Sequence, residues 1–175
     1  MTKFSSHLIS YRTNRLTIGP FKLSMVESVH LLSLDKDNRR FVLDEVFIDD
    51  KAAEETIVHL INSYQSPKGP FVYAIQKDGQ YIGHIQLVKI ESGYEVGYHI
   101  GKPYVGSGYA TEALLGFLPI IKTHFGLSEV CGVCDADNIA SRKVLEKAGF
   151  IKQYEGLGTY HGREIAVCRY QKILD

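Results

Sequence analysis

The sequence lacks the features that mark several common classes of protein. Its 20 lysine and arginine residues balance 20 aspartate and glutamate residues, so no net positive charge points to nucleic acid or to an acidic membrane surface. The longest apolar runs, such as residues 114–121, are too short to span a bilayer, and no charged region followed by an apolar one opens the chain. We therefore expect a soluble, cytoplasmic protein with no nucleic-acid or membrane partner.

Cysteine is also scarce. The three cysteines, Cys131, Cys134 and Cys168, are an odd number, which argues against a disulfide framework. Cys131 and Cys134 form a C-x-x-C pattern, but residues three apart on a strand point to opposite faces. A zinc site would also need two more ligands nearby. We expect no metal site and no redox role for this pair.

The chain is organised around residues 103–114, where a glycine loop runs directly into an amphipathic helix. Gly106 and Gly108 lack Cβ, so the backbone there can take special dihedral angles and approach a ligand closely. The unpaired N–H groups of the first helical turn, at the positive end of the helix dipole, favour a phosphate. The helix is indicated by apolar residues at three- and four-residue spacing, namely Ala110, Ala113, Leu114, Phe117, Leu118, Ile121 and Phe125.

A glycine loop before a helix can also be a tight turn that binds nothing. No Lys-Ser or Lys-Thr follows Gly108, which disfavours a P-loop. The loop follows a run of predicted hairpins, which disfavours a dinucleotide-binding unit of strand, helix and strand. A nucleotide-binding α/β domain nevertheless stays open as a rival interpretation.

Periodicity and turn residues predict the other elements. Helices are expected over residues 23–34 and 51–64, from about 110 to 125, and from 138 to 149. Strands are expected over residues 12–18, 71–76, 81–90, 94–100, 129–134 and, as a last hairpin, 150–156 with 164–172. Residues 35–50 read as an exposed loop, and Pro119 should kink or end its helix. Gly97 indicates a bulge or a close approach within its strand, and a bulge would splay this strand from the next.

Two motifs resemble the GCN5-related N-acetyltransferase (GNAT) superfamily. Residues 103–108 are similar to its motif A, Q/R-x-x-G-x-G/A, with Pro103 at the first position. Residues 138–150 resemble the N-x-x-S-x-x-V-L-E-K-x-G-F of the RimJ/RimL-type branch, and residues 13–18 resemble its opening T-x-R-L. The resemblance implies one N-acetyltransferase domain over residues 1–175. Its α/β fold, of the α+β type, would have a mostly antiparallel, curved and splayed sheet flanked by helices.

The same resemblance implies acetyl-CoA as cosubstrate and direct transfer of its acetyl group to a primary amine in a ternary complex. The amine would be a protein N-terminus or a small cationic amine, and the protein a monomer or homodimer without a metal. The loop amides would hold the pyrophosphate, and a splay at Gly97 would admit the pantetheine arm. The expected cofactor-binding residues are His99, Ile100, Val105, Gly106, Ser107, Gly108, Tyr109, Ala110, Thr111, Asn138, Ser141 and Lys143.

The reaction needs a neutral amine, yet free amines are mostly charged at pH 7, so a base is useful. Glu95 lies on the strand before the loop, and by resemblance it is the expected base; otherwise it is an edge carboxylate facing solvent. His99 shares its predicted face and is either a second candidate base or a residue of which only the backbone matters. A backbone N–H of His99 or Ile100 would stabilise the oxyanion.

The departing thiolate benefits from a proton. Many relatives place a tyrosine where this chain has Leu145, so Ser141 is the remaining candidate donor, as a relay, unless its hydroxyl only bonds the cofactor or the helix backbone. Asn138 is expected to hold the pantetheine or pyrophosphate, and Lys143 either reaches the phosphates or faces water. The absence of that tyrosine also leaves open a non-catalytic module that binds acetyl-CoA.

Negative charge gathers between the first two predicted helices. By resemblance this region walls the acceptor side of the cleft, so it would attract a cationic amine; the alternative is a solvated, acidic helix start. The residues concerned are Asp44, Glu45, Asp49, Asp50, Glu54 and Glu55.

Overall fold

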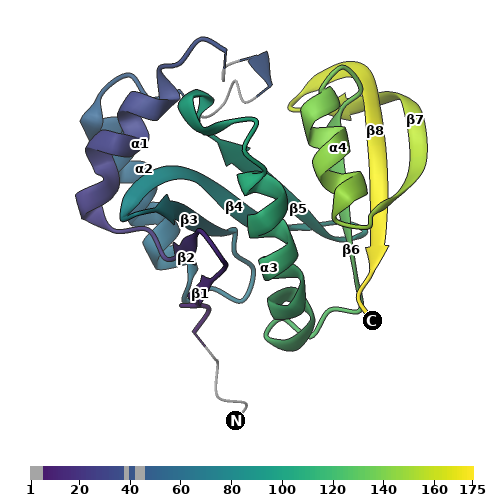
Figure 1. The fold of residues 1–175 in the computed structure, drawn as a ribbon, viewed down its shortest axis with the longest axis horizontal. Helices are drawn as coiled ribbons and strands as arrows, with labels where there is room; N and C mark the ends of the chain where they lie inside the picture. The colour runs from purple at the N-terminus through teal and green to yellow at the C-terminus, as the bar shows by residue number, and fades with distance from the viewer. Residues whose placement is uncertain (1–5, 38–39, 42–45) are drawn as a thin grey trace.

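The computed structural model of the protein describes residues 6–37, 40–41 and 46–175. Eight strands form one mixed sheet in the order β1-β2-β3-β4-β5-β6-β8-β7, with helices on both faces (Figure 1). All neighbouring strands are antiparallel except β5 and β6, which are parallel. The predicted fold class is confirmed. No helix within these residues is long and apolar enough to cross a membrane.

The elements follow the predicted order closely. The helices are α1 (Val26–Ser33), entered through a short 3₁₀ turn (Leu23–Met25), α2 (Asp50–Ser63), α3 (Tyr109–Thr123) and α4 (Ile139–Lys147). The strands are β1 (Tyr11–Arg12), β2 (Thr17–Gly19), β3 (Phe71–Lys77), β4 (Gln80–Ile90), β5 (Gly93–Ile100), β6 (Glu129–Asp135), β7 (Ile151–Tyr160) and β8 (Arg163–Ile173).

The single strand predicted over residues 12–18 is wrong, because the chain turns back between β1 and β2. The Thr13 N–H donates to the Leu16 carbonyl (3.0 Å), and the Thr13 hydroxyl accepts from the Leu16 N–H (3.1 Å). These two bonds close a turn around Asn14 and Arg15. The turn projects Arg15 away from the sheet, which matters for the site described below.

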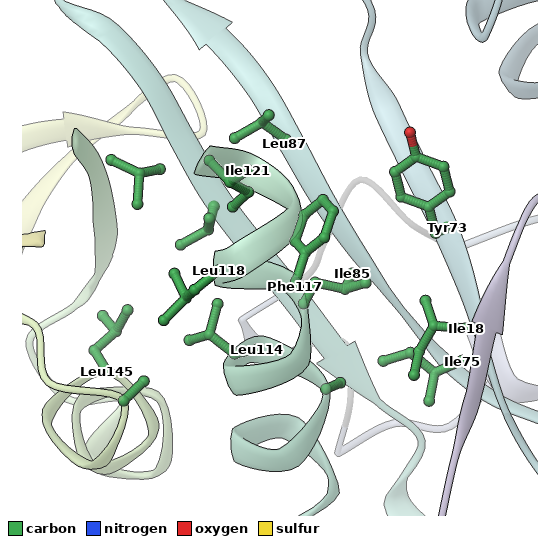
Figure 2. Packing of buried hydrophobic residues seen from close by; sticks show 14 of the residues in the cluster. Ile18, Tyr73, Ile75, Ile85, Leu87, Leu114, Phe117, Leu118, Ile121 and Leu145 are labelled. Carbon is green, nitrogen blue, oxygen red and sulfur yellow. The ribbon is translucent and has the colours of Figure 1, made fainter. Parts of the chain in front are cut away.

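Helix α3 covers one face of the sheet and forms the larger core. Its buried side, including Leu114, Phe117 and Ile121, packs against Ile85 and Leu87 of β4 (Figure 2). Burying such side chains contributes about 1.5–3 kcal/mol each, which fixes the helix on the sheet. The glycine loop at the start of α3 is thereby held in place by the core.

Pro119 does not end α3, which continues to Thr123. A proline removes the N–H that would bond the carbonyl of Leu115, four residues earlier. Both Pro119 and Leu115 are exposed, so this carbonyl lies on the side of the helix that water can reach. The helix therefore tolerates the proline.

Helices α1 and α2 cover the opposite face of the sheet. Val29 of α1 and Ile57 of α2 are buried against Val72 and Ala74 of β3 in a second apolar cluster. In the β3–β4 and β4–β5 ladders, Val72 pairs with Gln86 and Gln86 with Gly97, so these residues share this face. The polar residues of β4 and β5 thus lie on the side of α1 and α2.

Strands β5 and β6 diverge after one paired position. Their ladder contains the pair Glu95–Cys131, whereas β4 and β5 pair continuously from Ile90 and Gly93 to Gly83 and Ile100. The splay is therefore present. Of the two alternatives predicted for Gly97, the bulge is excluded because the β4–β5 register does not shift there. The close approach is confirmed, because the Gln86 side chain packs directly on Gly97: a Cβ at this position would lie 2.6 Å from Nε2 of Gln86.

Candidate active site

The glycine loop has the backbone that its sequence predicts. Gly106 and Gly108 have φ values of +83° and +81°, in the left-handed region that favours glycine. Gly108 is the N-cap of α3, and its carbonyl accepts the N–H of Glu112 (3.0 Å). The helix therefore begins at Tyr109, directly after the second glycine.

The backbone N–H groups of residues 106–111 lie at this helix start. Among the described residues, none of them donates a hydrogen bond. Val105, Gly106, Ser107 and Gly108 are exposed, and the positive end of the α3 dipole lies here. The loop therefore presents free donors to an anion, as predicted.

Arg15 ties the β1–β2 turn to this loop. Its Nε donates to Oε2 of Glu112 (2.7 Å), its Nη2 donates to the Ser107 carbonyl (2.9 Å), and its guanidinium lies 4.5 Å from the centre of the Tyr109 ring. Oε1 of Glu112 accepts from the Thr13 hydroxyl (2.6 Å) and from the Arg15 N–H (2.8 Å). We call Thr13, Arg15 and Glu112 the loop clamp.

The bonds of the loop clamp stabilise the charged form of the Glu112 carboxylate. Burial raises the pKa of Glu112, but the bonds from Thr13 and Arg15 outweigh burial and leave it below its usual value. Sequence reasoning missed the clamp, although the T-x-R-L pattern that contains Thr13 and Arg15 was noted. Glu112 lies 97 residues after Arg15, and no local pattern pairs them.

Tyr98 of β5 bonds to Ser141 of α4 beside the divergence of β5 and β6, which we call the cleft. The Tyr98 hydroxyl lies 3.0 Å from both the carbonyl oxygen and Oγ of Ser141 at the start of α4. Burial raises the pKa of Tyr98, so the phenol stays protonated. Asn138 caps α4 through Oδ1, which accepts the Ser141 N–H (3.1 Å). The structure therefore brings Ser141 and Asn138 together at the cleft, and adds Tyr98, which sequence reasoning missed.

The hydrogen-bond pattern between β4 and β5 shows which backbone N–H of β5 is directed to the cleft. The Gly101 N–H donates to the Ile82 carbonyl (2.8 Å), and hydrogen-bonded pairs alternate along an antiparallel ladder. His99 and His84 are therefore the next bonded pair, and the His99 N–H points to β4. The Ile100 N–H points the other way, to the side where β6 has diverged. Of the two donors expected from the sequence, the geometry favours Ile100.

Glu95 lies at the one position where β5 and β6 still pair. Burial raises its pKa to about 7, and electrostatic interaction with His161 and Arg169 offsets part of that effect. It shares the α1/α2 face of the sheet with Gly97 and His99. The Cys131 thiol opposite has a pKa raised to about 11, by burial and by the charge of Glu95. Glu95 can thus gain or lose a proton near neutral pH while Cys131 stays a thiol.

His99 lies farther along the same face, beside an apolar cavity. Its ring centre is 5.6 Å from that of His84, the partner residue on β4. Both rings line a cavity of about 250 Å³ between α1, α2 and the sheet. The His99 side chain is thus directed to this cavity and its backbone N–H to β4, so its contact with the cofactor stays a prediction.

The acidic stretch before and within α2 has local roles where the structure describes it. Asp49 caps α2 by accepting the Ala52 N–H (2.8 Å), and Asp50 lies 2.6 Å from Nδ1 of His30. Glu54 and Glu55 are exposed on α2. The prediction for Asp44 and Glu45 falls outside the described residues. Lys143 is exposed on α4, so its contact with the phosphates stays a prediction.

Comparison with known proteins agrees with this arrangement. The Acetyltransferase (GNAT) domain matches residues 15–151. The protein described as uncharacterized N-acetyltransferase YnaD of Bacillus subtilis (strain 168) is 26% identical over 143 residues, which cover 81% of this chain and 82% of YnaD.

Two solved structures share the fold. A GNAT-family acetyltransferase from Bacillus anthracis superposes with a TM-score of 0.81 at 21% identity, over 94% of this chain and 98% of that one. RimL, a ribosomal alpha-N-protein acetyltransferase solved in complex with coenzyme A, superposes with a TM-score of 0.83 at 18% identity, over 95% and 99%. Because the domain match covers well over half of the chain, the protein belongs to the GNAT family of acetyltransferases.

Proposed function

We propose that the protein transfers the acetyl group of acetyl-CoA to a primary amine by direct attack in a ternary complex. The observation that carries the proposal is Glu95, a half-buried carboxyl with a pKa of about 7 at the opening between β5 and β6. A poised base near neutral pH is what amine acetylation requires. The likeness to RimL supports a place in the RimJ/RimL-type branch and, with it, a protein N-terminus as one class of acceptor.

Binding of acetyl-CoA would use the glycine loop. The free N–H groups of residues 106–111 and the α3 dipole would hold the pyrophosphate, and the loop clamp would keep these donors aligned. The pantetheine would follow the splay between β5 and β6, past Asn138. This arrangement delivers the thioester to the part of the cleft that Glu95 borders.

The chemical step would begin with removal of a proton from the ammonium form of the acceptor. Glu95 accepts this proton, and the neutral amine attacks the thioester carbon, so that a C–N bond forms and the carbonyl oxygen becomes negative. The Ile100 N–H stabilises that oxygen. As the C–S bond breaks, the attacking nitrogen gives up its extra proton and the leaving thiolate takes one, with the Ser141 hydroxyl, bonded to Tyr98, as the relay between them.

A non-catalytic module that binds acetyl-CoA is the second candidate. It is favoured by Leu145, which stands where many relatives have a tyrosine and is buried in the core. A leucine side chain has no acidic proton to donate to the thiolate. A non-catalytic module would not need a carboxyl with a raised pKa at Glu95. We therefore prefer the enzyme.

The test is an assay of acetyl-CoA with a panel of amines, following free thiol and the acetylated product by mass spectrometry. We expect equal amounts of both, and loss of both in Glu95→Gln with acetyl-CoA affinity retained. Acetyl-CoA binding without any acetylated amine would support the non-catalytic module instead.

A further inference from the structure

The cavity beside His99 has the size and walls of a pocket for a flat apolar group. It holds about 250 Å³, and its walls come from both α1 and α2 as well as from the sheet. A cavity of about 150 Å³ with aliphatic and aromatic walls is enough to bind benzene. Seven of its lining residues from these elements and the loop before α2 have apolar side chains: Val29, Leu32, Val46, Phe47, Ile57, Leu60 and Val72.

Three of the polar side chains in the wall, those of Ser33, Tyr81 and His84, are bonded within the protein. The Ser33 hydroxyl donates to the His30 carbonyl (2.7 Å) and accepts the Phe47 N–H (3.1 Å). Tyr81 and His84 are within 3.5 Å of each other through their hydroxyl and Nδ1. Among the described residues that line the cavity, none is Asp, Glu, Lys or Arg. A second charge on a ligand would therefore be desolvated there without a counter-ion.

The cavity and the proposed base lie on the same face of the sheet. Gln86 lines the cavity and pairs with Gly97, which is two residues from Glu95 on the same face of β5. Two residues of a strand span about 7 Å. Gly97 has no side chain of its own, and the Gln86 side chain lies over it, with Nε2 at 2.6 Å from where a Cβ would be. A ring in the cavity and an amine at Glu95 would thus be separated by a linker of a few bonds.

We propose that this cavity, the acceptor pocket, receives a neutral apolar or aromatic group of the acceptor while its amino group reaches Glu95. The inference rests on the proposed function and names its substrate class: arylalkylamines or large aliphatic amines, or an N-terminal residue with such a side chain. The amino group is the only charged group of these acceptors. We therefore expect a cationic acceptor with a single positive charge, not a polyamine.

The test compares kcat/KM of the wild-type enzyme for ethylamine, phenylethylamine and putrescine, and for peptides that begin with phenylalanine or serine. We expect phenylethylamine to exceed ethylamine by about tenfold or more, and putrescine to show no such gain. If the peptide that begins with phenylalanine exceeds the one that begins with serine by as much as phenylethylamine exceeds ethylamine, the acceptor is a protein N-terminus. If only the small amines show the preference, the acceptor is a small amine. Equal rates for ethylamine and phenylethylamine would overturn the acceptor pocket while leaving the acetyltransferase intact.

A pocket-filling variant gives a second test. Thr56→Phe places a ring in the pocket from α2, and Val58→Phe is its matched control because Val58 lies on the same helix with 42% of its surface exposed. Thr56→Phe should lower the preference for phenylethylamine over ethylamine about tenfold, whereas Val58→Phe should leave it unchanged. An unchanged preference in a folded Thr56→Phe protein would contradict the proposal.

A binding measurement covers the case in which no amine is acetylated, an outcome that refutes the proposed function. Titration calorimetry with N-acetylphenylethylamine and N-acetylethylamine, in the presence of coenzyme A, then tests the pocket alone. Tighter binding of the phenyl compound supports the pocket, and equal binding overturns it.

Discussion

The substitution Glu95→Gln removes the proposed base and keeps the size of the side chain. With a pKa of about 7, the carboxylate fraction of Glu95 is about 0.09 at pH 6 and about 0.91 at pH 8. The base-dependent part of kcat/KM should therefore rise about tenfold over this range. Burial of the carboxyl is the main cause of the raised pKa, so the midpoint of this rise reports the folded site.

The assay is the ratio of wild-type to Glu95→Gln kcat/KM at a series of pH values. Protonation of the free amine affects both enzymes equally and cancels in this ratio. We expect the ratio to rise with a midpoint near pH 7 and to reach about 100 at alkaline pH, the lower end of general-base effects. Glu91→Gln, in the exposed turn after β4, is the control and should behave as wild type. A ratio that does not change with pH would refute the assignment of Glu95 as base.

The same pKa predicts a change in stability. The folded-state value lies above the ordinary 4.5, so the folded protein binds this proton more tightly than the unfolded chain. The resulting stability is present below about pH 4.5 and is lost as pH rises through about 7. At 1.36 kcal/mol per pKa unit, the loss is roughly 3 kcal/mol. Glu95→Gln should therefore have a higher urea midpoint than wild type at about pH 8 and a similar one at about pH 4.5; equal midpoints at both would place Glu95 in water.

Three further predictions concern the loop and the cleft. Gly108→Val should weaken acetyl-CoA binding about tenfold or more by calorimetry, because a β-branched residue is strained at φ +81°. Gly126→Val, at φ +67° beyond α3, is the matched control, and equal losses would disconnect the loop from the cofactor. Glu112→Gln should release Arg15 and also weaken acetyl-CoA binding, whereas unchanged affinity would make the loop clamp dispensable. Ser141→Ala should lower kcat about 10- to 100-fold with little change in acetyl-CoA affinity, and an unchanged kcat would remove the relay.

The phosphate loop was predictable because its signals are local. Gly106 and Gly108 stand next to a strongly periodic helix, and their special dihedral angles, the helix start and the unpaired donors all follow from about twelve consecutive residues. The strand positions of Glu95 and His99 were predictable for the same reason. Local pattern failed at residues 12–18, where the hydroxyl of Thr13 closes a turn inside an apparently continuous strand.

The rest of the site depends on contacts between distant parts of the chain. The loop clamp joins residues 97 positions apart, and Tyr98 meets Ser141 across 43 positions. The raised pKa of Glu95 depends on burial, which β-strand propensity does not report. The pairing of His84 with His99 and the walls supplied by α1 and α2 likewise create the acceptor pocket only in the folded protein.

The most direct test of the account is to mix the protein with acetyl-CoA, with and without an amine acceptor, and to follow coenzyme A, amine and intact protein by mass spectrometry. Direct transfer predicts release of coenzyme A only when the amine is present, one acetylated amine for each coenzyme A, and an unchanged protein mass. The high pKa of the Cys131 thiol agrees with that prediction, because a protonated thiol is a poor nucleophile. Acetylated protein formed without amine, or coenzyme A released without any acetylated amine, would contradict the account.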